Sequence, residues 1–504
     1  MALAWTLFSI YLLGTSYLGW LGFKRTKGFG SFAIGNGDLS PLVVGVTLAA
    51  STASAATFII NPGFVYVDGL SAFIHLAVGV YLGFVLMLIL LSFRFRRMGD
   101  EMKALTIPDW IGKRYQSKNF SLYFAFINLF TFAFIVLLVG GISIVMQKLL
   151  GVDNVTALGI TLVFVTGYVL IGGTYAHVFT NMLQGSLMVG VTILVLVTGA
   201  KLMFSGEVNL WQNLAAIDPN LTKAINPSSV FYNSFFSVFV AGFCIGAALV
   251  CQPHILTKAL YVKTDKAVRN YIAVFSVVFL LFCLLLAAGF WAHIVVEPNQ
   301  LKDATTGAFR QDLVMTVYLQ NSFPDWVFTI VSVVLLAAAM STLDGLLVGI
   351  STITANDLVL NLVNRGDSSK TEEQKMKLAY RASHIILILI AILAFAVTLN
   401  PPKLLGIFGQ TGVYALVVAT VPPLLLGILF REVAISLVWA CSILGVAAHF
   451  LLFFYGKTWF PNSTLAFANP GVTATLGLFA GLIPAFIGTF LIPKSLTQKI
   501  QYDK

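Results

Sequence analysis

Two hydroxyls and a carboxylate interrupt an apolar stretch in the second half of the chain. Ser341, Thr342 and Asp344 stand among leucines and alanines in the sequence "LLAAAMSTLDGLL". At membrane depth, an aspartate costs ~2.5–3.5 kcal/mol on insertion scales. Ionisable residues kept at such depth are functional hypotheses by default, because a purely structural helix does not need them. These three side chains are therefore the first candidates for chemistry.

Two other apolar stretches carry helix-breaking residues. The run "PLVVGVTLAASTASAATFIINPGFVY" is rich in Ala, Ser and Thr and ends near Asn61-Pro62-Gly63, and "FVAGFCIGAALVCQPHIL" ends near Gln252-Pro253-His254. A Pro-Gly pair interrupts helical hydrogen bonding, and the freed carbonyls of irregular backbone at membrane depth can line a site. Small residues also permit close helix–helix contact, which is the alternative interpretation. The two stretches therefore predict either a cation site or tight helix packing.

The composition places these stretches in a membrane. Of the 504 residues, 58% are hydrophobic and 10% are charged, whereas soluble domains carry about 25% charged residues. A spanning helix needs about 20 mostly apolar residues. We therefore predict an all-α integral membrane protein with thirteen spans, at residues 2–23, 40–66, 71–95, 119–149, 154–173, 177–204, 230–257, 270–296, 326–356, 380–399, 403–430, 433–455 and 472–493.

The basic residues predict the orientation of the chain. If the N-terminus is outside and the spans alternate, 23 of the 30 Lys and Arg lie on the cytoplasmic side, Lys258 among them. This asymmetry follows the positive-inside rule. The net charge of +10 then reflects basic residues that face an anionic lipid leaflet. It does not indicate binding to nucleic acid. We predict a multi-pass protein of the plasma or inner membrane with its C-terminus in the cytoplasm.

The first apolar run needs a separate interpretation, because secretory signal peptides are also N-terminal and apolar. It begins "MALAWT", without a positive n-region, and its basic residues follow the run at Lys24, Arg25 and Lys27. Signal peptides carry their positive charge before the apolar region. We therefore expect a retained first helix, with a signal peptide as the alternative.

The two broken spans lie five spans apart, so they cross the membrane in opposite directions. Spans 2–6 and 7–11 are therefore candidates for an inverted repeat, in which paired broken helices indicate a transporter's binding site. We expect a single polytopic domain. It comprises an extra N-terminal helix and loop (1–39), a first repeat (40–204), a second repeat (230–430), and two C-terminal helices with a short cytoplasmic tail (431–504).

The cysteine and histidine patterns argue against a metal cluster and against an enzyme. The four cysteines are scattered without a CxxC pair, and the six histidines show no zinc-ligand spacing. No nucleophile–base set or cofactor loop is recognisable in the sequence. We therefore expect no catalytic residues, and the sequence predicts no protein partner.

Four motifs resemble those of the sodium:solute symporter family. In chain order they are "LTIPDWIGKRY", "GGTYAHVFTNMLQGSLM", "CQPHILTKALYVKTDKAV" and "LLAAAMSTLDGLL". The resemblance covers nearly the whole chain and is nearest to the proline and pantothenate symporters. It implies a LeuT-type 5+5 inverted repeat with thirteen helices, Na+ as the coupling ion, and import of a small organic solute by alternating access. The alternatives are a proton-coupled symporter using Asp344 and a channel-like or sensory protein on the same fold.

The resemblance also implies a sodium site between the second and ninth spans. Carried over residue by residue, its ligands are the backbone carbonyls of Ala50, Ala53 and Ala338 and the hydroxyls of Ser341 and Thr342. Carbonyl and hydroxyl oxygens suit a small hard cation, and the last three residues share one helix face through their i, i+3, i+4 spacing. The alternative role of the two hydroxyls is hydrogen bonding back to the preceding turn.

Some family members hold a second sodium ion beside an aspartate of the sixth span. In this chain Asn181 stands at that position, and Asp344 and Gly345 stand where those relatives carry serines. The carboxylate thus looks relocated across the helix interface. We expect Thr180, Asn181 and Asp344 to form a second cation site, with a proton site and a structural Asp–Asn hydrogen bond as the competing interpretations.

The solute pocket is expected beside the two breaks. No Arg or Lys lies well within the predicted spans to face a carboxylate. This favours a small neutral, zwitterionic or monocarboxylate solute, since an anion would depend on helix N-termini, bound sodium or a protonated His75. Ordinary interhelical hydrogen bonding is the alternative role of each polar candidate. The candidates are Ser51, Ser54, Thr57, His75, Ile245, Leu249, Gln410, Thr411 and Tyr414.

Overall fold

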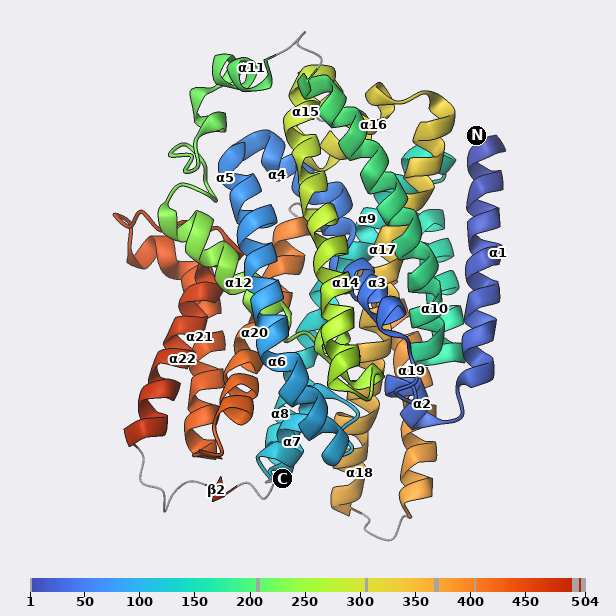
Figure 1. Ribbon diagram of the computed structural model, residues 1–504, viewed down its shortest axis with the longest axis vertical. Coiled ribbons are helices and arrows are strands. Elements are labelled where there is room, and N and C mark those ends of the chain that lie inside the picture. Colours follow the sequence, from blue (N-terminus) through green and yellow to red (C-terminus); the bar gives the residue numbers. More distant parts are fainter. Residues whose placement is uncertain are drawn as a thin grey trace.

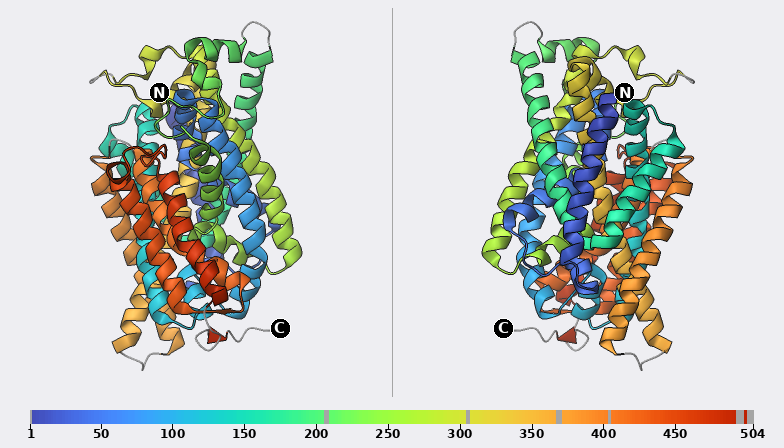
Figure 2. Two further views of the ribbon diagram at one scale, coloured as in Figure 1. Left: turned by 90° about the vertical axis from the view of Figure 1, so that its left-hand side faces the viewer. Right: turned by 90° about the vertical axis from the view of Figure 1, so that its right-hand side faces the viewer.

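Helices make up almost all of the computed structural model, which describes residues 2–204, 209–303, 307–366, 371–402, 405–491 and 498–499. The long helices run side by side along the long axis of the molecule (Figures 1 and 2). The strands named in the described part are β1 (Glu432–Val433) and β2 (Gln498–Lys499), which pair antiparallel. Most of the predicted C-terminal tail lies outside the described residues.

In the described part of the chain, ten helical stretches are long and apolar enough to cross a membrane, and there are twelve if each of two bent helix pairs counts as one span. The prediction of an all-helical polytopic membrane protein is thereby confirmed. The ten stretches are built from α1 (Ala2–Arg25), α5 (Leu70–Phe73), α6 (Val80–Glu101), α8 (Lys118–Ile127), α9 (Thr131–Leu150), α10 (Asn154–Phe204), α14 (Asp265–Leu284), α15 (Ala288–Val295), α17 (Asp325–Ile353), α18 (Leu360–Gly366), α19 (Glu372–Thr398), α20 (Leu405–Leu429), α21 (Ile435–Trp459) and α22 (Pro470–Leu491).

The long helices differ in how deeply the protein buries them. In their most apolar windows, 94% of α20 and 72% of the stretch containing α17 are buried, against 28% of α1, α19 and α21. Figure 1 shows α1 at one margin of the molecule and α21 and α22 at the other. A hydrophobic helix that is mostly uncovered by protein suits a lipid-facing position. Shorter helices connect or flank the long ones, namely α2 (Phe29–Ile34), α7 (Ile107–Arg114), α11 (Leu210–Ile217) and α16 (Val314–Ser322).

The first broken span bends at Ala53 rather than at its Pro-Gly pair. Helix α3 (Pro41–Thr52) ends where Ala53 takes non-helical angles (φ −83°, ψ 78°), and the following helical segment is bent away by 56°. Pro62 lies in α4 (Asn61–Asp68), which directly follows the π-helical turn Ala56–Ile60, so the helical path continues through Asn61-Pro62-Gly63. The break expected at Asn61-Pro62-Gly63 is therefore wrong, and the actual break lies in the stretch rich in Ala, Ser and Thr.

The second broken span bends where its sequence predicts. Helix α12 (Ala241–Leu249) is followed by an extended Gln252 (φ −67°, ψ 140°), and Pro253 begins α13 (Pro253–Leu256). The two parts of this span meet at 62°. The helical path then continues through a 3-10 turn, Thr257–Tyr261, so the span does not end at residue 257 as expected.

A reversal at Gly173 divides the long helical segment α10. Gly173 has φ 49° and ψ −135° inside residues 154–204, which the sequence analysis divides into spans 154–173 and 177–204. A Cβ atom at position 173 would lie 2.5 Å from Cδ2 of Phe32. Glycine is needed here both for the positive φ and for this close approach. The reversal brings residues before and after it to one region of the molecule.

We predict that Gly173→Ala lowers the stability of the purified protein. The positive φ and the ψ of −135° at this position are rarely adopted by an L-residue and cost about 1–3 kcal/mol, and the added methyl also collides with Phe32. The measurement is the thermal unfolding midpoint in detergent. Gly190→Ala is the matched control on the same helical segment, because nothing lies within 4 Å of its added Cβ. Equal midpoints for the two variants would contradict the requirement for glycine at the reversal.

Candidate cation and solute site

The hydroxyls of α17 meet the broken end of α3. Ser341 Oγ donates hydrogen bonds toward Ala50 O at 3.0 Å and Ala338 O at 2.7 Å. Thr342 Oγ1 donates to Ser51 O at 3.0 Å. Both hydroxyls therefore reach across to α3, while Ser341 Oγ also makes the expected bond back to the preceding turn of α17. The interface concentrates neutral oxygen atoms at a helix break.

The remaining expected sodium ligand, Ala53, lies at that same break. It is the residue that ends α3, and it is fully buried together with Ala50, Ala338, Ser341 and Thr342. Carbonyl and hydroxyl oxygens at such an interface match the preference of a hard cation for oxygen ligands. The structure thus brings α3 and α17 together where the sequence predicts a sodium site.

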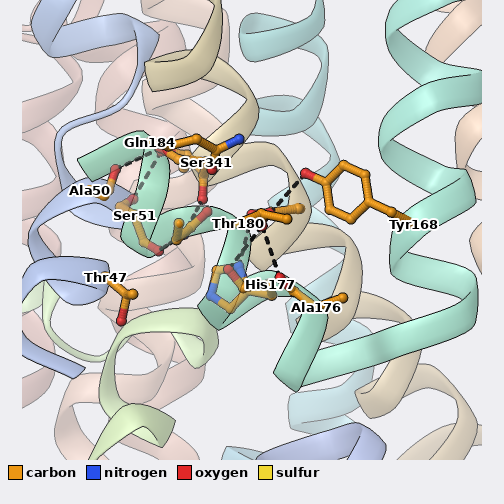
Figure 3. A network of polar contacts seen from close by, with 12 residues as sticks. Thr47, Ala50, Ser51, Tyr168, Ala176, His177, Thr180, Gln184 and Ser341 are labelled. Carbon is orange, nitrogen blue, oxygen red and sulfur yellow. Dashed lines mark hydrogen bonds and ion pairs between the residues drawn. The ribbon is translucent and has the colours of Figure 1, made fainter. Parts of the chain in front are cut away.

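Asn181 ties α10 to the same interface. Its Nδ2 donates to Ser51 Oγ at 2.9 Å and to Ser341 O at 2.7 Å. Both amide hydrogens are thereby used, whereas its buried Oδ1 has no hydrogen-bond partner. Figure 3 shows Ala50, Ser51 and Ser341 close together in this network. Asn181 therefore cross-links α3 and α17 beside the candidate sodium ligands.

A fully buried lysine lies against α3 on the same side of the break. Lys258 has 0% exposure. Its Nζ lies 3.0 Å from Thr47 O, 2.9 Å from Ser51 Oγ and 3.1 Å from His177 Nε2. The ammonium thus joins the second broken span to α3 and to α10.

The predictions that Lys258 lies in a cytoplasmic loop and that no lysine lies well within the spans are both wrong. The bend of 62° before Pro253 carries the turn Thr257–Tyr261 inward. A hydropathy profile treats a lysine just after a Pro-containing break as a loop residue. The signal that could have found it is its apolar surroundings, "HILTKALYV", in which Lys258 is the only ammonium.

The carboxylate of Asp344 contacts three side chains of α10. Its Oδ1 lies 2.8 Å from His177 Nδ1, and its Oδ2 accepts from Tyr168 at 2.9 Å and from Thr180 at 3.1 Å. Tyr168 precedes the reversal at Gly173 and the other two residues follow it, as Figure 3 shows for the labelled side chains. The reversal therefore encloses the carboxylate from two directions.

Two residues of this enclosure, Tyr168 and His177, are absent from the sequence-based site. The histidine is part of the motif "GGTYAHVFTNMLQGSLM", but nothing in the motif indicates a partner. The expected contact between Asp344 and Thr180 is present. The Asp344–Asn181 hydrogen bond offered as an alternative is not formed, because the amide hydrogens of Asn181 go to Ser51 and Ser341.

A cavity of about 90 Å³ lies beside both helix breaks. Six of the nine expected solute-binding residues line it. Phe84, Phe134 and Phe279 add aromatic walls that the sequence does not indicate, and Asn61 and Gln252 add amide groups. The expected residues that line this cavity are Ser51, Ser54, Thr57, Leu249, Gln410 and Tyr414.

The other three expected solute-binding residues lie outside the lining of this cavity. His75 Nδ1 is 2.7 Å from Ser237 O. Thr411 Oγ1 donates back to Ile407 O at 2.8 Å, and Ile245 is fully buried. His75 therefore joins two separate segments, whereas the Thr411 hydroxyl bonds within α20.

Comparison with known proteins gives consistent matches over most of the chain. Residues 32–445 match the model of the Sodium:solute symporter family. A sodium/pantothenate symporter of Haemophilus influenzae is 29% identical over 441 residues, covering 85% of this chain and 86% of that protein. A sodium/proline symporter of Escherichia coli is 25% identical, covering 79% of this chain and 78% of that protein.

A solved structure shows the same overall fold. It is the substrate-bound, outward-open state of a Na+-coupled sialic acid symporter, with a TM-score of 0.75 and 18% sequence identity. The alignment covers 99% of both chains. The similarity shows the LeuT-like fold that the sequence resemblance implies, and the 5+5 inverted repeat with thirteen helices stays a prediction.

We predict that Gly345→Ala disturbs His177 and destabilises the protein. A Cβ atom at position 345 would lie 2.8 Å from Cε1 of the imidazole, which Lys258 and Asp344 hold at both nitrogens. Overpacking of this kind costs about 1–3 kcal/mol, so the thermal unfolding midpoint in detergent should fall. Gly349→Ala is the control one turn along α17, because its Cβ meets only an ordinary contact at 3.9 Å. An unchanged midpoint for Gly345→Ala would show that His177 is free to move.

Proposed function

Because the chain belongs to the sodium:solute symporter family, and its activity is therefore sodium-coupled solute symport, we propose that the coupling sodium ion binds where α3 breaks against α17. The supporting observation is the contact of Ser341 Oγ with the carbonyls of Ala50 and Ala338. A sodium ion would replace the hydroxyl hydrogens as the partner of these oxygens. Ala53 and Thr342 would complete the ligand set.

The proposal assigns thirteen spans to the chain. Ten long stretches and two bent pairs make twelve, and dividing α10 at the reversal of Gly173 adds one. The bent pairs then lie five spans apart, as an inverted repeat of residues 40–204 and 230–430 requires. The basic residues support a plasma-membrane or inner-membrane protein with an external N-terminus and a cytoplasmic C-terminus.

The proposed solute is small and carries hydrogen-bond donors. Among the residues that the structure describes, no Asp, Glu, Lys or Arg lines the cavity beside the breaks. Two of the amides that line it, Asn61 and Gln252, each have a buried side-chain oxygen without a hydrogen-bond partner. Such oxygens favour a ligand with N–H or O–H groups. A neutral, zwitterionic or monocarboxylate solute fits this lining, and the relatives named for proline and pantothenate belong to these classes.

The proposed inward route follows a series of neighbouring cavities. His254 lines both the solute cavity and a small cavity of about 20 Å³, and Leu105 lines that small cavity and a larger one of about 550 Å³. These two side chains separate successive cavities. Alternating access would require both to move when the solute leaves toward the cytoplasm. The relatives are transporters, and the proposal assigns no catalytic residue and no protein partner.

We expect Ser341→Ala to raise the half-saturating sodium concentration for uptake about tenfold, which corresponds to ~1.4 kcal/mol. The variant removes one oxygen ligand and leaves the fold otherwise unchanged. Ser351→Ala is the matched control, because Ser351 is also fully buried on α17 but donates only within its own helix, to Val348 O at 3.1 Å. Equal sodium dependence of the two variants would place the ion elsewhere.

Proteoliposomes given an inward sodium gradient should accumulate a labelled solute from a panel that includes proline, pantothenate and a polyanion such as citrate. Uptake is expected for a zwitterion or monocarboxylate and not for the polyanion, since no Lys or Arg of the described residues lines the cavity. A potassium gradient of equal size is the control. Equal uptake driven by a pH gradient without sodium would contradict sodium coupling.

A further inference from the structure

The hydrogen bonds of the cluster formed by Lys258, His177 and Asp344 determine its charge. An ammonium has three hydrogens and no lone pair. Lys258 Nζ has three acceptors at 2.9–3.1 Å, namely Thr47 O, Ser51 Oγ and His177 Nε2. His177 therefore accepts at Nε2 and donates from Nδ1 to Asp344 Oδ1, 2.8 Å away. This assignment joins an ammonium to a carboxylate through a neutral imidazole.

The net charge of the cluster is zero. Transfer of a proton from Lys258 through His177 to Asp344 would leave all three groups hydrogen-bonded. It would not change the net charge of the cluster. Lys258 and Asp344 have 0% exposure and His177 has 1%. A buried carboxylate without a positive partner is strongly unfavourable. The lysine thus supplies inside the protein the charge that Asp344 needs.

We propose that the Lys258 ammonium is a resident counter-cation that takes the place of a second sodium ion, so that the symporter binds one sodium ion per cycle. The inference rests on the proposed sodium site at Ser341. The oxygens of Asp344 already accept hydrogen bonds from His177, Tyr168 and Thr180. The unpartnered Oδ1 of Asn181 is a neutral amide oxygen, and alone it does not replace a carboxylate as the ligand of a second cation.

Lys258 is also a positioning residue for the first sodium ion. Its Nζ binds Ser51 Oγ, while the carbonyl of Ser51 accepts from Thr342. The neighbouring carbonyl of Ala50 accepts from Ser341. The ammonium therefore holds the end of α3 where the carbonyls face α17. It also links the two broken spans to each other.

The test is equilibrium binding of ²²Na+ to the purified full-length chain, measured by scintillation proximity. This readout needs no identified solute. We expect about one sodium ion per chain with a Hill coefficient near one for the unaltered protein. Lys258→Met removes the ammonium and leaves Asp344 without a partner, so it should bind about two sodium ions with a Hill coefficient above one. Lys258→Arg keeps the charge and should keep one ion.

Lys266→Met is the control for loss of a lysine, because Lys266 is exposed on α14 and its variant should bind as the unaltered chain does. Two sodium ions on the unaltered chain would overturn the inference and leave the proposed sodium site intact. No saturable sodium binding would instead overturn the proposed site. One ion on a folded Lys258→Met chain would also overturn the inference.

A second variant decides the case in which Lys258→Met does not fold. The double variant Lys258→Met with Asp344→Asn removes both charges and should restore a folded protein that binds one sodium ion. Such rescue supports the proposed pairing of the Lys258 ammonium with the Asp344 carboxylate. It would show that Lys258→Met prevents folding only when the carboxylate of Asp344 is present. A double variant that also fails to fold overturns it.

Discussion

The break after Thr52 leaves backbone oxygens outside the helical ladder in a mostly buried part of the protein. In a membrane interior, such groups must be satisfied by the protein itself or by a bound ion. Ser341 and Thr342 supply hydroxyls to the carbonyls of Ala50 and Ser51. In the proposed site, a sodium ion would take the place of the two hydroxyl hydrogens beside these carbonyls and could later leave. The reversible ion binding that we propose would then follow from the interruption of α3.

The same requirement explains why a carboxylate and an ammonium occur together at this depth. Either charge alone would be costly inside the protein, whereas the pair joined through His177 is neutral. The geometry depends on two departures from regular helix, the reversal at Gly173 and the bend before Pro253. The first brings His177 and Tyr168 to Asp344, and the second brings Lys258 under α3. Asp344 is therefore explained by its protein partners.

The sequence predicts contacts within regular helices better than contacts created by bends. Helical spacing predicts that one face of α17 carries Ala338, Ser341 and Thr342. The family motif predicts that this face contacts α3. Lys258 could not be placed because its position depends on the direction of the chain after a break, which periodicity does not encode. The bend of the first broken span was misplaced for a related reason, since the π-helical turn Ala56–Ile60 lets the helix continue through Pro62, and π-turns of this kind are not encoded in the hydrophobic pattern.

A resident counter-cation also sets an energetic limit on transport. One sodium ion moving inward contributes about 2.3 kcal/mol at 100 mV, and a tenfold sodium gradient adds about 1.4 kcal/mol. Together they can concentrate a neutral solute about 500-fold, whereas two ions would reach about 10⁵-fold. A lysine that stays with the protein adds no ion gradient to this driving force. With one sodium ion, occupancy of the site rises with the first power of the sodium concentration. Such a carrier therefore stays active at lower sodium concentrations than a carrier that must bind two ions. A lysine in place of a second sodium ion therefore lowers the sodium concentration that transport requires. It also lowers the solute concentration ratio that transport can reach.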